Sequence, residues 1–327
     1  MTIKEVASQA GVSTAAVSRY FNGGSLSEAK REQIRKVVEE NSYTPNTLAK
    51  TMRTGRSGHV GVIVPRIHSD SMSQIMSGIA DGLKENDYKF ILGCTDNEKE
   101  KEIQFIKSMQ RSGMDGIILM GTVMTPYLMD TIASCEIPIV VTGQSFSGVS
   151  SVYHDDVHSM KDIALIMLKK KRNVAYIGVD EADAAVGQAR RRGVEKAFSE
   201  MGLDPGKLIR MVSDYTIESG YEQAEKLLRE HPETDGIICA TDTIAHGVMK
   251  AVKAAGKRIP EDISVTGVGN SWADTITEPQ LTTVKLYFEE CGRVAVNILM
   301  QMINSKDKDI PVSNMKLGYQ IIERGSV

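Results

Sequence analysis

The chain of 327 residues lacks the features of several protein classes. Its four cysteines are far apart and form no C-x-x-C pair: Cys94, Cys135, Cys239 and Cys291. Such cysteines are typical of free thiols in a reducing compartment rather than of a disulfide framework. No apolar run is long enough for a membrane-spanning helix. The N-terminus also lacks the charged and apolar segments of a secretory signal, so we expect a cytoplasmic protein.

Motifs of common enzyme classes are also missing. The sequence contains no P-loop, no G-x-S-x-G and no H-E-x-x-H motif. The Gly-Val-Gly at 267–269 lacks the third glycine of a dinucleotide-binding fingerprint. Residues 154–158 (HDDVH) combine the side chains of metal ligands, but they follow a short predicted strand, where the aspartates are better explained as helix caps. We therefore expect no catalysis, no metal site and no cofactor.

Charge is distributed unevenly along a chain whose net charge is −3. Residues 1–56 contain nine Lys or Arg and five Asp or Glu, a net charge of +4, which leaves −7 for the remainder. A small basic head on an acidic body suits a protein that contacts phosphate through its N-terminal part only. At about 100–200 residues per domain, the length predicts two domains or more.

The N-terminal residues 2–22 predict two short helices around a tight turn. Apolar residues at i, i+3, i+4 and i+7 define one face of the first helix: Ile3, Val6, Ala7 and Ala10. Gly11 can end this helix, and Ser13 can cap the second. The second helix is apolar on the side of Val17, Tyr20 and Phe21.

The other side of this second helix is small and hydrogen-bonding. Its residues are Ala15, Ser18, Arg19 and Asn22. Such a helix can enter the major groove of DNA, where Arg19 can donate two hydrogen bonds to a guanine edge. An ordinary helical hairpin would show the same spacing, so the pattern alone leaves both interpretations open.

A third helix, ending near Asn41, completes a small three-helix core. Its cationic side chains either contact DNA phosphates or are merely solvated: Lys30, Arg31, Arg35 and Lys36. Residues 46–57 follow as a short helix, because Pro45 suits its start and Gly55 its end. A helix of about two turns is marginal in isolation, so its folding would depend on what it contacts. A plain linker is the alternative.

Residues 7–22 carry the pattern A-x-x-A-G-V-S-x-x-x-V-S-R-x-x-N. This pattern resembles the N-terminal signature of the LacI/GalR family of bacterial repressors, and the resemblance continues through the chain. It implies a dimeric, sugar- or metabolite-responsive transcription factor whose hinge helix lies at 46–57. Met52 stands where the family usually has a leucine that enters the minor groove, and an apolar, flexible side chain can do the same.

The resemblance and the helix pattern together assign the DNA contacts. The expected residues are Thr2, Ser13, Thr14, Ala15, Ser18, Arg19, Asn22, Asn46, Ala49 and Met52. Among them, Thr14, Ala15 and Arg19 are expected to read bases. Because the first two are small and make few hydrogen bonds, specificity is expected to depend on Arg19 and on DNA shape.

From His59 onward, short apolar runs alternate with helical patterns of ten or more residues. The runs lie at 60–64, 88–93, 116–120, 138–142, 174–178, 236–240 and 263–268. Such alternation predicts doubly wound parallel sheets, and the runs are too many for one compact sheet. We therefore predict an α/β chain with two lobes, like a periplasmic binding protein, behind an all-α helix-turn-helix head.

The domain boundaries follow from these patterns and from the resemblance. The head is 1–45, the hinge 46–57 and the effector-binding body 58–327. The resemblance implies that the chain passes between the lobes near 158, 286 and 314. The N-lobe then comprises about 58–158 and 287–313, and the C-lobe about 159–286 and 314–327.

Ligands of open α/β sheets bind beyond the carboxyl ends of the strands, so residues that follow the apolar runs are candidates for a cleft. The predicted effector site comprises Arg66, Ser69, Ser71, Gln144, Arg190, Tyr215, Asp242, Asn270 and Phe288. By the resemblance, Arg190 holds sugar hydroxyls, while Tyr215 and Phe288 stack on the sugar. Asn270 departs from the acidic residue usual in the family. Alternatively, Asp242 is a helix cap and Phe288 a core residue.

These observations predict a repressor of a carbohydrate operon that binds a pseudo-palindromic operator in the bacterial cytoplasm, at the nucleoid. The effector is expected to be a disaccharide or its phosphate, as in trehalose- and sucrose-responsive members. Gln144 stands where the trehalose-phosphate type has an arginine. The chain ends without an added heptad helix, so we expect a homodimer. The sequence leaves open whether the effector induces or corepresses.

Two other classes of protein fit the sequence less well. A carbohydrate-binding protein without a DNA role would share the body, but would need a signal peptide and would lack residues 1–57. A nucleotide-using enzyme would need a phosphate loop or catalytic triad, and the sequence shows neither.

Overall fold

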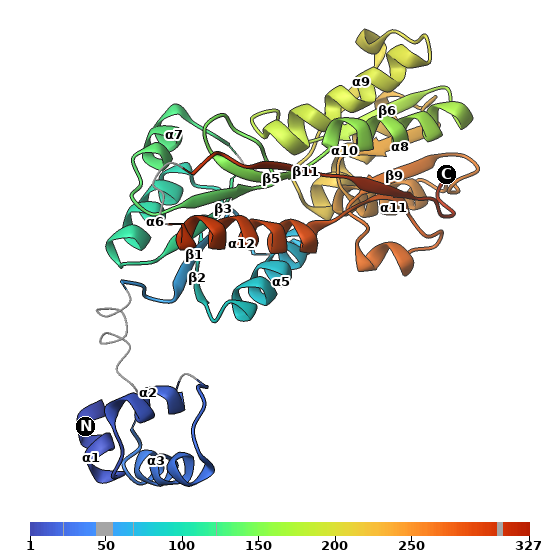
Figure 1. Ribbon diagram of the computed structural model, residues 1–327. Coiled ribbons are helices and arrows are strands. Elements are labelled where there is room, and N and C mark those ends of the chain that lie inside the picture. The colour runs from blue at the N-terminus through green and yellow to red at the C-terminus, as the bar shows by residue number, and fades with distance from the viewer. Residues whose placement is uncertain (22, 44–54, 68, 122, 306–309) are drawn as a thin grey trace. The chain divides into compact units, whose positions relative to one another are not determined.

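Two compact units make up the chain, and each is described here by itself. The computed structural model describes residues 1–21, 23–43, 55–67, 69–121, 123–305 and 310–327. The first unit is Met1–Gly58 and the second is His59–Val327 (Figure 1). Within these ranges, no helix combines the length and the apolar character that crossing a membrane requires.

The first unit is a head of three helices. These are α1 (Ile3–Gln9), α2 (Thr14–Phe21) and α3 (Glu28–Glu40). Val6, Val17 and Ile34 are fully buried at its centre, as the sequence pattern predicts. Ile3 was expected on the same buried face but is 36% exposed, because it lies at the very start of α1.

The second unit begins with an N-lobe built on a six-stranded sheet of order β11-β5-β4-β3-β1-β2. Its strands are β1 (His59–Val64), β2 (Lys89–Cys94), β3 (Gly116–Met120), β4 (Ile139–Thr142), β5 (Ser150–His154) and β11 (Asn314–Leu317). Its helices are α5 (Asp70–Glu85), α6 (Lys99–Arg111), α7 (Pro126–Ala133) and α12 (Phe288–Asn304). All strand pairs are parallel. Val62 and Ile63 pack into different apolar clusters, so helices cover both faces.

The C-lobe repeats this arrangement in a second sheet of order β12-β10-β9-β8-β6-β7. Its strands are β6 (Val174–Gly178), β7 (Ile209–Val212), β8 (Gly236–Cys239), β9 (Ser264–Val268), β10 (Thr282–Leu286) and β12 (Tyr319–Ile322). Its α-helices are α8 (Asp156–Lys170), α9 (Arg190–Glu200), α10 (Ile217–Glu230) and α11 (Asp242–Ala254). Short helical turns are η1 (Ala184–Ala189), η2 (Pro205–Lys207) and η3 (Trp272–Thr275). Only β12 is antiparallel among the described pairs of this sheet.

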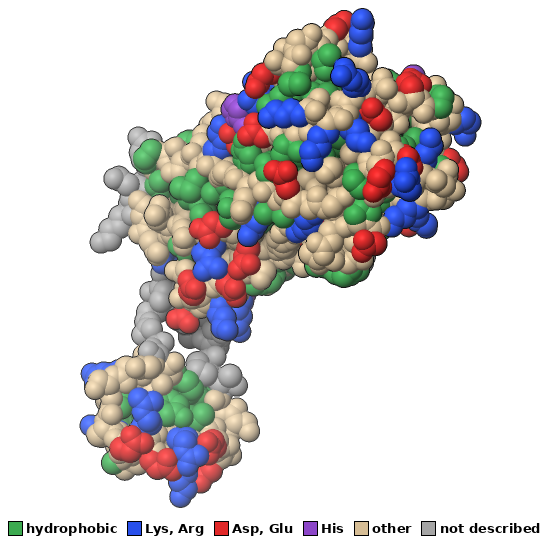
Figure 2. Space-filling view, turned by 90° about the vertical axis from the view of Figure 1, so that its right-hand side faces the viewer, with side chains coloured by type: hydrophobic (Ala, Val, Ile, Leu, Met, Phe, Trp, Pro, Cys, Tyr) green, Lys and Arg blue, Asp and Glu red, His purple; other side chains and the backbone are tan. Residues whose placement is uncertain are grey.

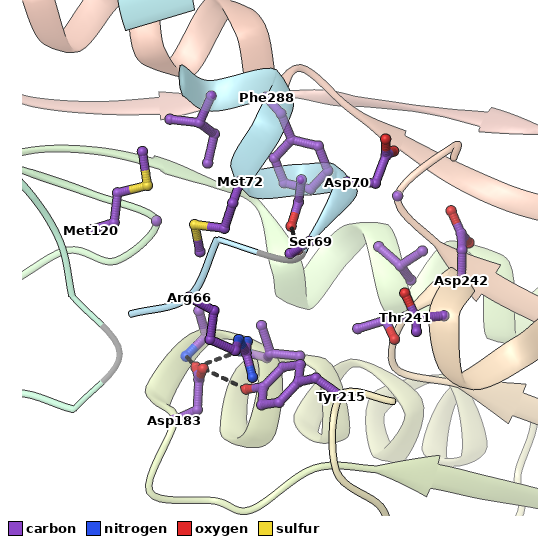
Figure 3. Close-up of a pocket in the computed structure, with 18 of the residues that line it drawn as sticks. Arg66, Ser69, Asp70, Met72, Met120, Asp183, Tyr215, Thr241, Asp242 and Phe288 are labelled. Atoms are coloured by element: carbon purple, nitrogen blue, oxygen red, sulfur yellow. Dashed lines mark hydrogen bonds between the residues drawn. The ribbon is translucent and has the colours of Figure 1, made fainter. Parts of the chain in front are cut away.

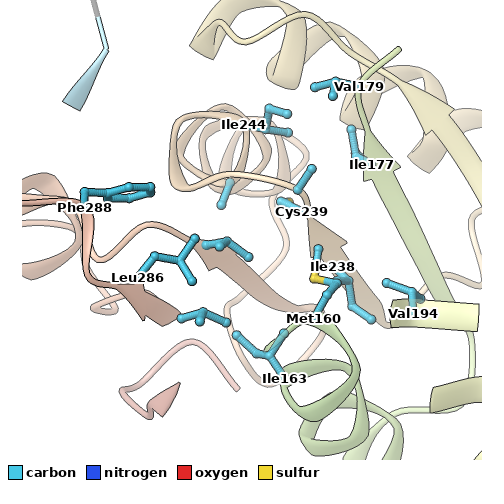
Figure 4. Close-up of a cluster of buried hydrophobic side chains, with 14 of the residues drawn as sticks. Met160, Ile163, Ile177, Val179, Val194, Ile238, Cys239, Ile244, Leu286 and Phe288 are labelled. Carbon is cyan, nitrogen blue, oxygen red and sulfur yellow. The ribbon is translucent and has the colours of Figure 1, made fainter. Parts of the chain in front are cut away.

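The core of the C-lobe lies between its sheet and the helices on either face. Figure 4 shows Ile238 of β8 close to Met160 and Ile163 of α8, with Ile244 of α11 on the other side of the strands. All four side chains are fully buried. The predicted α/β class with two doubly wound, mainly parallel sheets is therefore confirmed.

The chain passes between the two sheets three times. It leaves the N-lobe between β5 and α8, and returns to it between β10 and α12 at Tyr287. The third passage is at Gly318, between β11 and β12, slightly later in the chain than the position near 314 that was expected. The reason is that Asn314–Leu317 pairs with β5 and extends the N-lobe sheet.

Helices α5 and α12 of the N-lobe approach each other closely through glycines. A Cβ atom added to Gly78 would clash with the carbonyl oxygen of Glu289, and one added to Gly292 would clash with that of Ile75. The two helices therefore touch backbone to backbone, with no side chain between them at these positions.

We expect Gly292→Ala to lower the free energy of unfolding by about 1–3 kcal/mol, because overpacking forces the helices apart. Urea denaturation followed by circular dichroism measures this change. Gly318→Ala is the matched control, since a Cβ there meets open space. Equal stability of the two variants would show that the contact between α5 and α12 is not a tight one.

Candidate functional site

A cavity of about 630 Å³ lies between the two lobes of the second unit. This volume falls within the range of about 300–1,000 Å³ that is usual for small-molecule sites. All the predicted effector residues but one line it: Arg66, Ser69, Ser71, Gln144, Arg190, Tyr215, Asp242 and Phe288. They come from both lobes, mainly from segments that follow the carboxyl ends of strands (Figure 3).

Asn270 is the predicted residue that is not among those lining the cavity. Its side-chain oxygen accepts a hydrogen bond of 2.7 Å from Nη2 of Arg324. Its backbone has a φ of 54°, in the left-handed region, which turns the chain after β9. The Asn270 side chain therefore holds the loop after β9 against Arg324 instead of pointing into the cavity.

Asp183 lines the cavity, although the sequence analysis did not predict it. It caps η1, where its Oδ1 accepts hydrogen bonds from the backbone amides of Ala185 (3.0 Å) and Val186 (2.8 Å). Gln144 of the N-lobe donates to Oδ1 at 3.3 Å, and the Tyr215 hydroxyl of the C-lobe donates to Oδ2 at 2.7 Å. One carboxylate thus connects both lobes across the cavity.

The Tyr215 ring also contacts a charged side chain of the opposite lobe. The guanidinium carbon of Arg66 lies 3.9 Å from the ring centroid, a cation–π contact. Burial, together with the Asp183 carboxylate, raises the pKa of Tyr215, so its hydroxyl stays protonated as a donor. Nε of Arg66 is buried with no hydrogen-bond partner among the described residues, so it can donate to a ligand oxygen.

Arg190 is buried within the C-lobe wall of the cavity. Its Nε pairs with Oδ1 of Asp156 at 2.8 Å, and both side chains are 6% exposed. Its Nη1 donates to the carbonyl oxygen of Ala240 at 2.5 Å. Burial alone would lower the pKa of Arg190, but the neighbouring acidic groups together, Asp156 first among them, raise the pKa overall. The arginine that was predicted to bind sugar therefore also stabilises the cavity wall through an ion pair with Asp156.

Asp242 lies in the first turn of α11, although it is not the cap. Thr241 caps the helix by accepting a hydrogen bond from the amide of Ile244 at 3.2 Å. The Asp242 carboxyl accepts from the Thr283 hydroxyl (2.5 Å) and from the Ser271 amide (3.0 Å). Burial, and then the neighbouring Asp274 carboxylate, raises the pKa of Asp242 well above its usual value.

Phe288 opens α12 at the second passage between the lobes. It is 8% exposed and meets the ring of His154 edge to face, with the centroids 5.1 Å apart. Both residues also line the cavity, so the core and ligand-facing roles weighed for Phe288 coexist. Burial lowers the pKa of His154 and keeps its imidazole neutral.

Next to His154, Asp155 caps α8. The described residues contain no group of three or more potential metal ligands.

The head presents several of the predicted DNA-contacting residues at its surface. Thr14, Ala15 and Arg19 are exposed on α2, and Ser18 of the same helix is half-buried. The Ser13 hydroxyl accepts a hydrogen bond from the Ala16 amide at 3.2 Å, as expected of a cap. Four of the predicted contacts lie outside the described residues: Asn22, Asn46, Ala49 and Met52.

Two other residues of the head form contacts within or next to their own helices. Thr2 forms a capping box with Glu5 at the start of α1, where it accepts a hydrogen bond from the Glu5 amide at 3.3 Å. On α3, Arg35 pairs with Glu32 at 2.6 Å and with Glu39 at 2.8 Å, both in exposed positions. Arg35 is thus engaged within its own helix, in line with the solvated alternative for this face.

We expect Arg190→Met to destabilise the protein by about 3–5 kcal/mol, because it leaves the buried Asp156 carboxylate without its partner. Chemical denaturation measures the effect. Arg192→Met on the same helix is the control, since Arg192 is exposed. Adding Asp156→Asn to Arg190→Met should recover part of the loss. If Arg190→Met proves as stable as the control, the ion pair does not support the cavity wall.

Comparison with known proteins matches the two units to two descriptions. Residues 2–46 match "Bacterial regulatory proteins, lacI family", and residues 166–327 match "Periplasmic binding protein-like domain". The chain is 29% identical over 329 residues to the HTH-type transcriptional regulator RegA of Clostridium saccharobutylicum, covering 99% of this chain and 98% of that protein.

A second relative and a solved structure agree with this match. The sucrose operon repressor of Staphylococcus xylosus is 28% identical over 302 residues, covering 92% of this chain and 93% of that protein. The lac repressor dimer bound to operator and the anti-inducer ONPF has the same fold, with a TM-score of 0.87 at 22% identity, covering 100% of this chain and 98% of that chain. Residues 2–46 therefore belong to the LacI family of bacterial regulatory proteins, and nearly the whole chain is similar to a transcriptional regulator.

Proposed function

We propose that the protein is a transcriptional repressor of a carbohydrate-utilisation operon, controlled by a sugar bound between its lobes. The observation that carries this proposal is the polar cavity between two lobes in a chain that begins with a helix-turn-helix head. The relatives are transcriptional regulators, and one of them is named a sucrose operon repressor. Because its target is bacterial DNA, the protein would act in the cytoplasm, at the nucleoid.

The exposed side of α2 is the DNA-reading surface in this proposal. It offers Arg19 to a guanine edge, with the small residues Thr14 and Ala15 allowing a close approach to the bases. Figure 2 shows acidic and basic side chains interspersed on the visible face of the body. A face of mixed charge suits a body that leaves DNA contact to the head.

A homodimer would present two such heads to the half-sites of a pseudo-palindromic operator, since protein and operator symmetry match. The solved lac repressor with this fold is a dimer on its operator. The hinge predicted at 46–57 lies mostly outside the described residues, so its role stays a prediction.

The contacts across the cavity couple ligand binding to the arrangement of the lobes. Gln144 reaches Asp183 from the N-lobe, and Arg66 of the N-lobe stacks on Tyr215 of the C-lobe. A ligand that enters between these groups changes their contacts and so favours one lobe arrangement. The resulting change in DNA affinity is limited by the ligand's differential affinity for the two arrangements.

The proposal assigns binding rather than catalysis to the cavity. Its buried acidic groups already have partners: Asp156 with Arg190, Asp183 with Tyr215, and Asp242 with Thr283. Groups held in this way fix a ligand's orientation, whereas a general base must be poised to take its proton.

We expect Arg19→Ala to weaken discrimination between the operator and random DNA by about five- to 150-fold, since a bidentate contact contributes about 1–3 kcal/mol. Fluorescence anisotropy with an operator selected from a random pool measures both affinities. Arg35→Ala is the control, because Arg35 pairs with Glu32 and Glu39. Full discrimination by Arg19→Ala would remove this residue from base reading.

We expect Arg66→Met to weaken binding of the effector at least about tenfold, because hydrogen bonds from a charged donor contribute about 1.5–3 kcal/mol. A thermal-shift screen of sugars identifies the effector, and titration calorimetry then compares the variants. Arg111→Met, at the exposed end of α6, is the control. The same sugar should change the operator affinity of the wild-type protein. A sugar that binds with no effect on any duplex would contradict the proposed regulation.

A further inference from the structure

We propose that the effector carries no phosphate or other negative charge, and that the cavity is built to reject the phosphorylated form of the sugar it binds. This inference rests on the proposed sugar response and narrows it. The sequence allowed either a sugar or a sugar phosphate; the charges around the cavity separate the two.

Aspartates dominate the charged residues of the cavity wall. The wall contains six aspartates and two arginines: Asp70, Asp96, Asp156, Asp183, Asp214, Asp242, Arg66 and Arg190. No lysine lines the cavity in the part of the chain that the structure describes. Even with Asp242 protonated, aspartates outnumber arginines five to two. A phosphate dianion entering this wall would meet net repulsion.

The helix ends at the cavity strengthen this argument. A helix N-terminus normally attracts phosphate, because its free amides and dipole favour negative charge. Here α5, α8 and α11 each begin with an aspartate that lines the cavity, namely Asp70, Asp156 and Asp242. Asp183 likewise caps η1 with hydrogen bonds to two of its amides. At η1 a carboxylate of the protein itself therefore occupies the position that a phosphate would use, and at the other three helices an aspartate lies in the first turn.

One of the two arginines is already engaged in the cavity wall. Arg190 already gives Nε to Asp156 and Nη1 to the Ala240 carbonyl. Arg66 lies with its guanidinium over the Tyr215 ring, whose hydroxyl binds Asp183. The buried Nε of Arg66 can donate to a ligand oxygen, but this single guanidinium is outnumbered by the aspartates around it.

The same wall suits an uncharged sugar. Carboxylates accept hydrogen bonds from hydroxyl groups, and Asp70 and Asp214 are at least partly exposed in the cavity. Met72 and Met120 lie on one side of the cavity, while Asp242 and Thr241 lie on another (Figure 3). Apolar side chains can cover the C–H face of a pyranose ring, while the acceptors bind its rim of hydroxyls.

The test compares matched pairs of ligands on the full-length protein at constant ionic strength. Titration calorimetry is performed with trehalose and trehalose 6-phosphate, sucrose and sucrose 6-phosphate, and ribose and ribose 5-phosphate. Operator affinity is measured with each compound. For the pair that binds, we expect the unphosphorylated sugar to bind at least about tenfold more tightly, and inorganic phosphate not to compete.

Equal or tighter binding of the phosphorylated member, or competition by inorganic phosphate, would overturn this inference and leave the sugar response intact. If no sugar or sugar phosphate binds and none changes operator affinity, the proposed sugar response itself fails, and this inference fails with it. The two failures are therefore distinguishable.

A pair of variants on α5 tests the electrostatic cause. Asp70→Asn removes a charge from the cavity wall and should improve binding of the phosphorylated sugar about three- to tenfold. Asp81→Asn removes the same charge from an exposed position on the same helix, and should leave that affinity unchanged. Equal effects of the two variants would show that the wall carboxylates do not reject phosphate.

Discussion

The Asp183 carboxylate is the contact on which the cavity depends. It accepts hydrogen bonds from two amides of its own helix, from Gln144 of the N-lobe and from Tyr215 of the C-lobe. It thereby orients the ring on which Arg66 stacks. A single carboxylate therefore links side chains of both lobes. A ligand that alters these few contacts has a direct way to bias the lobe arrangement.

The strands that could be predicted are those whose residues form a continuous apolar run in the sequence. Strands β3 and β6 coincide with predicted apolar runs, since both faces of these parallel strands are covered by helices. Strands β7 and β11 lie at sheet edges, where most of their side chains are exposed, and they left no apolar run to detect. Because β11 pairs with β5, the chain stays in the N-lobe until Gly318. The sequence of a short segment does not show which strand it pairs with, so this position could not be predicted exactly.

The candidate site divides in the same way. The rule that ligands bind beyond strand ends placed Arg66 and Gln144 at the cavity. Asp183 follows no strand end directly, and only its position before a helix could have marked it as a cap; its link to Gln144 spans 39 positions. Asn270 follows a strand but turns to Arg324. The strand-end rule thus locates the cavity. It does not give the direction of each side chain, because that depends on partners far away in the sequence.

The contact between α5 and α12 has a mechanical consequence. With glycine at Gly78 and Gly292, the two backbones touch, and no intervening side chain can change rotamer to let the helices slide. Helices α5 and α12 of the N-lobe should therefore keep their relative positions when a ligand binds. Changes in backbone torsion would then concentrate in the three segments that connect the lobes. A ligand-induced shift at the cavity would therefore become a rotation of one lobe against the other, because the helices cannot absorb it by local repacking.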